Sequence, residues 1–134
     1  MQFWHDLSAL PADVESCMRS WDALEPVGFT REVFDDAAAR AFIAAHFNGE
    51  HVHAYDRCPH PAMRCDLFRL CYLVALGGFY VDADEDYQGV DCSFLFGDDR
   101  LKVASLCYDR DADDMVPAAT FADPASAHHR GRTT

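Results

Sequence analysis

The stretch over residues 64–86, RCDLFRLCYLVALGGFYVDADED, constrains the fold of this chain more than any other part of it. Apolar residues in it recur at the i, i+3, i+4, i+7 spacing, which predicts a helix with one buried face. They are Leu67, Leu70, Cys71 and Val74. Gly77 and Gly78 predict the end of this helix, because glycine adopts the left-handed capping conformation at no steric cost. Residues 79–81 then have the aromatic and β-branched character of a short strand.

The acidic residues after this strand predict a metal-dependent site. Side chains alternate along a strand, so Tyr80, Asp82 and Asp84 are expected on one side of it. Two carboxylates at a strand end form a hard oxygen site of the kind that suits Mn²⁺ or Mg²⁺. Since a site with so few protein carboxylates is usually completed by substrate phosphates, we expect a nucleotide or nucleotide-sugar ligand.

Asp66 and Arg69 interrupt the apolar pattern of the predicted helix. Their spacing of three residues places both side chains on one face of it. A partly buried carboxylate and guanidinium need polar partners, and the hydroxyl groups of a bound sugar would be suitable ones.

This combination resembles the sugar-binding region of glycosyltransferases that contain a DXD motif, the family-32-type enzymes. The resemblance is carried by Arg64-x-Asp66-x-x-Arg69, by Leu73, by the run GGFYVDAD over residues 77–84, and by FWHD near the N-terminus. It implies an α/β fold of the GT-A type, a Rossmann-type three-layer arrangement with a central, mainly parallel sheet that is incomplete at its C-terminus. It also implies transfer of a sugar, with retention, from a UDP- or GDP-sugar to a glycan or other hydroxyl acceptor.

The same resemblance implies roles for individual residues. Asp84 would ligate Mn²⁺ or Mg²⁺ directly, and Asp82 would contact the ribose or sugar and the water shell of the metal. Asp66 and Arg69 would hold the hydroxyl groups of the donor sugar, and Tyr80 would lie against the donor. Arg69, near the diphosphate, and Asp82 are the residues expected to act in catalysis.

Trp4 is the last residue of a predicted first strand over residues 2–4. The pattern alone favours a core aromatic at this position, whereas the resemblance implies that Trp4 stacks on the nucleotide base. Further strands and helices alternate along the chain, which predicts an α/β layout with a parallel sheet. They are a helix over residues 11–21, a strand over 29–34, and a helix that ends at Asn48 and Gly49.

Charge and cysteine usage exclude several classes of partner. The net charge of −12 argues against nucleic acids and anionic membranes, which bind basic surfaces. A phosphate ligand stays compatible with it, because a bound metal inverts the local charge. No apolar run approaches the length of about 20 residues that spans a bilayer. The six cysteines form no C-x-x-C pair, which favours reduced, buried thiols in a cytoplasmic protein.

A further group of histidine and cysteine side chains offers nitrogen and sulfur ligands of the kind that bind zinc. His51, His53, Cys58 and His60 lie close together, but their spacing matches no common zinc pattern. We expect surface and packing roles for them.

The domain prediction is a nucleotide-sugar-binding glycosyltransferase domain, a partial GT-A domain, over residues 1–110. An acidic loop and a disordered tail are expected over residues 111–134. Two alternatives to an active glycosyltransferase stay open. The first is a truncated, non-catalytic remnant that binds a nucleotide sugar, because nothing after Tyr108 resembles the later strands and lid of these enzymes. The second is a Mg²⁺-dependent hydrolase, although the sequence has no nucleophilic aspartate motif after an early strand.

Overall fold

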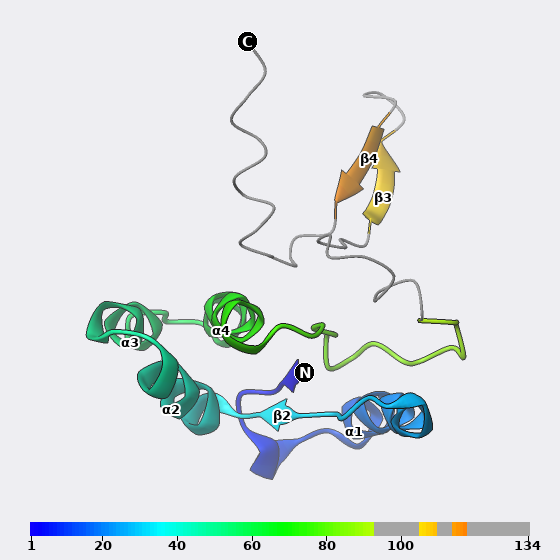
Figure 1. The fold of residues 1–134 in the computed structure, drawn as a ribbon, viewed down its shortest axis with the longest axis horizontal. Helices are drawn as coiled ribbons and strands as arrows, with labels where there is room; N and C mark the ends of the chain where they lie inside the picture. Colours follow the sequence, from blue (N-terminus) through cyan, green and yellow to red (C-terminus); the bar gives the residue numbers. More distant parts are fainter. Residues whose placement is uncertain (93–104, 110–113, 118–134) are drawn as a thin grey trace.

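The computed structural model describes residues 1–92, 105–109 and 114–117. Its elements in chain order are β1 (Gln2–Phe3), η1 (Leu7–Ala9), α1 (Ala12–Ser20), η2 (Trp21–Val27), β2 (Val33–Phe34), α2 (Asp36–His46), α3 (Gly49–Asp56), α4 (Pro61–Leu76), β3 (Ser105–Asp109) and β4 (Asp114–Pro117). Figure 1 shows β2 running between α2 and α1, with α3 and α4 on the same side of the fold as α2.

Parallel backbone pairing organises the N-terminal part of the chain. β1 pairs with β2, and Phe3 lies opposite Phe34. On its other side β1 meets residues 79–81: the Met1 nitrogen donates to the Phe79 carbonyl at 2.8 Å, and the Val81 N–H donates to the Met1 carbonyl at 3.1 Å. This exchange around one residue is the hydrogen-bond pattern of a parallel ladder. β1 therefore lies between β2 and residues 79–81.

The predicted α/β layout is confirmed at the level of helices around a small parallel sheet. Within the described residues the sheets have two strands each, β1 with β2 and β3 with β4, so a full three-layer sheet is not formed there. The strand predicted over residues 79–81 is not assigned as one. The hydrogen-bonded ladder between this segment and Met1 is too short to count as a strand, because a turn at Ala83 and Asp84 follows directly.

An aromatic core joins α4 to the sheet. Phe68 is fully buried, and its ring centroid lies 6.0 Å from that of Phe3, 4.9 Å from that of Phe34 and 5.7 Å from that of Phe42. The neighbouring residue on β1, Gln2, points the other way, toward η2. Helical segments therefore pack on both faces of β1, and the large aromatic rings fill the α2–α4 side.

The buried face of α4 differs from the predicted one. Phe68, Cys71 and Tyr72 are buried, whereas Val74, predicted to be buried, is 47% exposed. The helix is apolar on almost every side, so spacing alone does not select the inward face. The aromatic side chains of Phe68 and Tyr72 bury the most surface and therefore take the core side.

The role predicted for Asn48 and Gly49 is also wrong. α2 already ends at His46, and Asn48 is the N-cap of α3, where its side chain accepts from the Glu50 N–H at 3.0 Å. Asparagine is common both after a helix and at an N-cap, so its presence does not say which of the two it marks.

Only a small part of the C-terminal segment is described. β3 pairs antiparallel with β4, and β4 lies within the segment predicted as an acidic loop and a tail, so the domain division stays a prediction. The rest of the predicted 111–134 segment lies outside the described residues. Among the helices that the structure describes, none has the length and apolar character needed to cross a bilayer.

The turn after α4 leads to a first prediction. Gly77 has φ 72° and ψ −152°, a region that non-glycine residues rarely adopt, and its N–H donates to the Leu73 carbonyl. We expect Gly77→Ala to lower the free energy of unfolding by about 1–3 kcal/mol, because of backbone strain alone. An added Cβ at Gly77 would meet nothing within 4 Å.

Gly49 is the matched control for this change. It opens α3, and an added Cβ there also meets nothing within 4 Å. Gly49→Ala should leave stability unchanged or raise it by less than about 1 kcal/mol. Urea denaturation of both variants checks the pair, and equal losses would contradict the strain argument.

Candidate functional site

The candidate site lies at the carboxyl edge of the small parallel sheet. Because β1 and residues 79–81 run parallel, both segments end at the same edge. From β1 the chain crosses to β2, which pairs on one side of β1, and residues 79–81 later pair on the other side of β1. Such a reversal of strand order is where open α/β sheets bind ligands. Asp82 and Asp84 follow one segment at this edge, and Trp4 follows the other.

A buried guanidinium stands at the centre of the site. The Arg69 side chain, on α4, is only 11% exposed. Its Nη2 donates to Oδ1 of Asp66 one helical turn earlier, and its Nη1 lies 3.9 Å from Oδ1 of Asp82. The Asp66 and Asp82 side chains are 57% and 54% exposed. Arg69 thus holds two carboxylates that both face solvent.

Tyr80 connects this ion group to the core. Its hydroxyl donates to Oδ1 of Asp82 at 2.5 Å, and its oxygen lies 3.1 Å from Sγ of Cys65. Arg69 Cζ lies 5.0 Å from the centroid of the ring, within the range of a cation–π contact. The ring is buried in the hydrophobic core. The structure therefore brings Asp66, Arg69, Tyr80 and Asp82 together by direct contacts.

Asp84, two residues after Asp82, lies outside these contacts. Both are exposed and flank Ala83, which is buried. Glu85 completes an acidic group that the sequence analysis overlooked. Burial raises the pKa of the Glu85 carboxyl, and the charges of Asp82 and Asp84 raise it further. The acidic run in VDADED was the available signal, but the strand pattern directed attention to alternate residues only.

The loop after the acidic residues is held by the end of α1. The Trp21 indole N–H donates to the Glu85 carbonyl at 2.8 Å, and the Tyr87 N–H donates to Oγ of Ser20 at 2.8 Å. The Trp21 and Tyr87 ring centroids are 5.1 Å apart. Sequence spacing indicates only that Trp21 is apolar and inward-facing. Its indole N–H is what fixes the loop.

Trp4 is half-buried at the end of β1. Its backbone N–H donates to the Phe34 carbonyl at 3.0 Å, and its ring centroid lies 5.6 Å from that of His5. The indole nitrogen is buried and makes no hydrogen bond within the described part of the chain.

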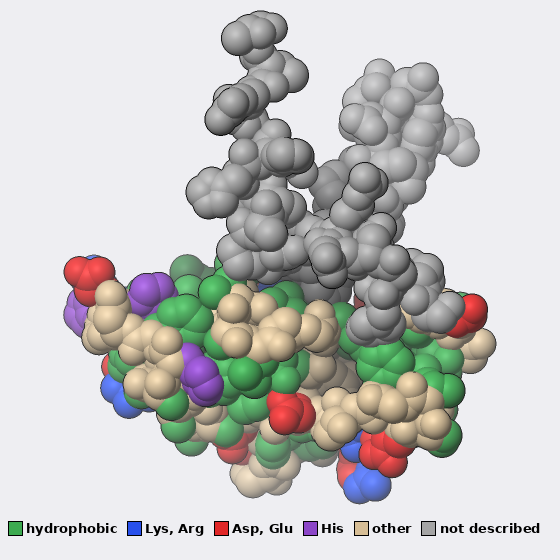
Figure 2. All heavy atoms as spheres, in the orientation of Figure 1, with side chains coloured by type: hydrophobic (Ala, Val, Ile, Leu, Met, Phe, Trp, Pro, Cys, Tyr) green, Lys and Arg blue, Asp and Glu red, His purple; other side chains and the backbone are tan. Residues whose placement is uncertain are grey.

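The donor set at the edge fits a hard divalent cation only if a ligand completes it. Among the described residues, no group of three or more histidine, cysteine, aspartate or glutamate side chains is arranged to hold a metal ion. Mg²⁺ and Mn²⁺ are commonly held by one or two carboxylates together with water and substrate phosphates, which is what Asp82 and Asp84 offer. The histidines near α3 gather on the surface without forming such a group (Figure 2).

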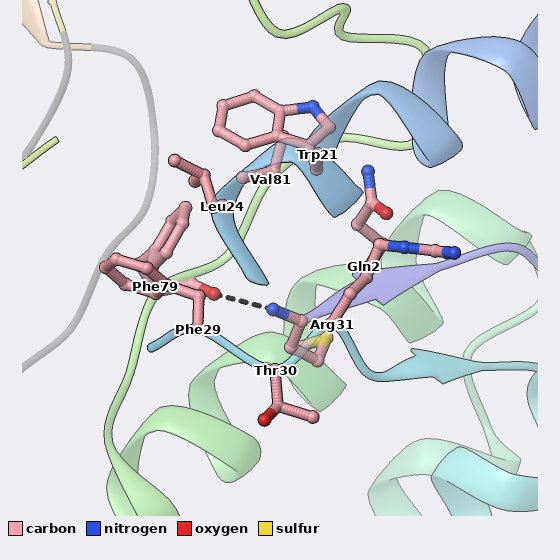
Figure 3. Close-up of a pocket in the computed structure, with 9 residues that line it drawn as sticks. Gln2, Trp21, Leu24, Phe29, Thr30, Arg31, Phe79 and Val81 are labelled. Carbon is pink, nitrogen blue, oxygen red and sulfur yellow. Dashed lines mark hydrogen bonds between the residues drawn. The ribbon is translucent and has the colours of Figure 1, made fainter. Parts of the chain in front are cut away.

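A separate small pocket, partly open to solvent, lies beside the opposite end of β1. Its walls include Gln2, Trp21, Phe29 and Phe79, and Figure 3 shows these side chains converging on it. None of the predicted site residues lines this pocket. We place the candidate site at the acidic edge, because the polar groups that match a ligand converge there.

The raised pKa of Glu85 predicts a pH effect. The unfolded carboxyl has its ordinary pKa of 4.5, so between that value and the higher native pKa the folded state binds more protons. Stability should fall as pH rises through this window and stay reduced above it. Glu85→Gln should therefore raise the melting temperature at pH 7, and the gain should vanish below about pH 4.

Thermal unfolding monitored by circular dichroism from pH 3.5 to 8 checks this. Glu25→Gln, an exposed change in η2, is the control and should show no comparable pH-dependent gain. A Glu85→Gln gain that is the same at every pH would contradict the burial argument.

Comparison with known proteins identifies the family of this chain. Residues 11–88 match the family described as glycosyltransferase sugar-binding region containing DXD motif. The match includes Asp66, Arg69 and the DXD residues and begins after Trp4. Searches of curated proteins and of solved structures gave no significant match. Since the match spans more than half of the sequence, the chain belongs to the family of DXD-containing glycosyltransferase sugar-binding regions.

Proposed function

We propose that this chain is the nucleotide-sugar-binding domain of a metal-dependent glycosyltransferase of the GT-A fold. Its donor would be a UDP- or GDP-sugar, and its acceptor a hydroxyl group of a glycan or another molecule. The observation that carries this proposal is the Asp66–Arg69–Asp82 group at the sheet edge. It combines exposed carboxylate acceptors with a buried fixed cation, directly beside the DXD residues.

In this proposal Asp66 and Arg69 bind the donor sugar. The Asp66 carboxylate is more than half exposed, so it accepts hydrogen bonds from sugar hydroxyl groups while Arg69 keeps it in place. Because Arg69 is largely buried, it acts mainly by orienting the carboxylates on either side of it. Its positive charge also favours the negative charge that develops on the leaving diphosphate.

Asp84 and Asp82 are the residues that would hold Mn²⁺ or Mg²⁺. When bound, the cation neutralises charge on the diphosphate leaving group. Asp82 would contact both the protein and the ligand. Its Oδ1 faces Tyr80 and Arg69, and the side chain is half exposed. In this proposal Trp4, which lies at the same edge, would stack on the base of the nucleotide.

The alternative of a non-catalytic nucleotide-sugar-binding remnant has a specific observation in its favour. The parallel sheet of the described residues has two assigned strands, which leaves little structure there for an acceptor site. The family match leaves the hydrolase alternative without support. Donor binding and sugar transfer must therefore be measured separately, because an active transferase shows both and a remnant shows binding alone.

Isothermal titration with UDP and GDP, with and without Mn²⁺, tests donor binding. We expect binding of one nucleotide that requires Mn²⁺. Asp84→Asn and Asp82→Asn should each raise its Kd by about tenfold or more, since a tenfold loss corresponds to about 1.4 kcal/mol.

Asp86→Asn is the matched control, because it removes one exposed negative charge two residues beyond Asp84. We expect it to change Kd by less than about threefold. Binding that is independent of Mn²⁺, or equally weakened in all three variants, would refute the proposal. Mn²⁺-dependent binding without sugar transfer in a radiolabelled-donor assay would support the remnant.

A further inference from the structure

We propose that Tyr80 is a positioning residue for Asp82 and Arg69, and that the Cys65 thiol acts on Asp82 through the Tyr80 hydroxyl. This inference rests on the proposed function and adds to it two residues that act from inside the core. It differs from the role implied by family resemblance, in which Tyr80 lies against the donor.

The number of available protons decides which atom donates in each hydrogen bond of the Tyr80 hydroxyl. A tyrosine hydroxyl has one proton, and an ionised carboxylate accepts only, so the Tyr80 proton goes to Oδ1 of Asp82. The contact between Cys65 and Tyr80 must then use the thiol proton, donated to the tyrosine oxygen. The result is a chain from S–H to O–H to carboxylate, in which each bond polarises the next.

Burial supports a positioning role for both residues. Tyr80 is 4% exposed and belongs to the hydrophobic core, and Cys65 is partly buried and packs against that core. Side chains in these positions are better suited to holding Asp82 and Arg69 in place than to reacting with a ligand.

The same tyrosine also supports Arg69. The guanidinium carbon lies 5.0 Å from the Tyr80 ring centroid, and Nη1 lies 3.9 Å from the carboxylate oxygen that accepts from the Tyr80 hydroxyl. Ring and hydroxyl thus fix the two charged groups relative to each other. Both contacts use Oδ1 of Asp82.

Tyr80→Phe tests the hydroxyl, because it keeps the ring and the contact with Arg69. We expect the nucleotide Kd in Mn²⁺ to rise about tenfold, from loss of a hydrogen bond to a charged group. Cys65→Ala should raise Kd by a smaller factor, and Cys65→Ser, which keeps a donor, should restore wild-type binding. Cys65→Ala added to Tyr80→Phe should cause no further loss, since the thiol acts through the missing hydroxyl.

Cys71→Ala is the matched control, because Cys71 is buried on the same helix and belongs to the core. It should lower the melting temperature and leave Kd unchanged. Unchanged Kd in Tyr80→Phe would overturn the inference alone, and additive losses in the double variant would overturn the part that concerns Cys65. If Tyr80→Phe does not fold, failure of Cys65→Ser to restore what Cys65→Ala loses overturns the inference. A wild-type chain that binds neither UDP nor GDP would overturn the proposed function and this inference together.

Discussion

The short backbone ladder between Met1 and residues 79–81 is the constraint on which the candidate site depends. It holds the segment that leads to the DXD residues beside β1 and parallel to it. Both segments therefore end at the same edge of the sheet. Gly77 makes this possible, because its positive φ turns the chain out of α4 directly into the ladder. Asp66 and Arg69 on α4 are then brought back against Asp82. Two hydrogen bonds and one turn therefore place groups from a helix and an extended segment around a common space.

The candidate site also requires that the buried positive charge of Arg69 be paired with negative charges. A guanidinium removed from water is costly unless it is paired, and its two terminal nitrogens face Asp66 and Asp82. Its Nε is buried and makes no hydrogen bond within the described residues. The pairing is thus incomplete on the protein side, whereas both carboxylates are open to solvent. A residue in this state is better suited to fixing the two carboxylates in place than to adding stability.

How much the sequence reveals varies with the kind of feature. The α4 helix, its glycine stop and the shared face of Asp66 and Arg69 follow from spacing, because the helix period decides which residues share a side. That Asp82 joins them was implied by the family resemblance. The inward face of α4 does not, since Val74 and Phe68 are equally apolar in a pattern and only packing against β1 separates them. The function of Trp21 in holding the loop is also hidden, because one indole N–H over a distance of 64 residues leaves no local signal.

The charge balance at the edge explains why a cation is needed for the proposed function. Asp66 and Asp82 pair with Arg69, and Asp84 and Glu85 follow Asp82 in the same acidic run. Burial raises the pKa of the Glu85 carboxyl, and the negative charges of Asp82 and Asp84 raise it further. A diphosphate approaching this edge adds further negative charge, and the net charge of −12 adds no general attraction. Hydrogen bonds from Arg69 alone cannot offset this, because Asp66 already occupies one of its terminal nitrogens. A divalent cation changes the sign of the local field, so that the carboxylates which repel free diphosphate become its binding site.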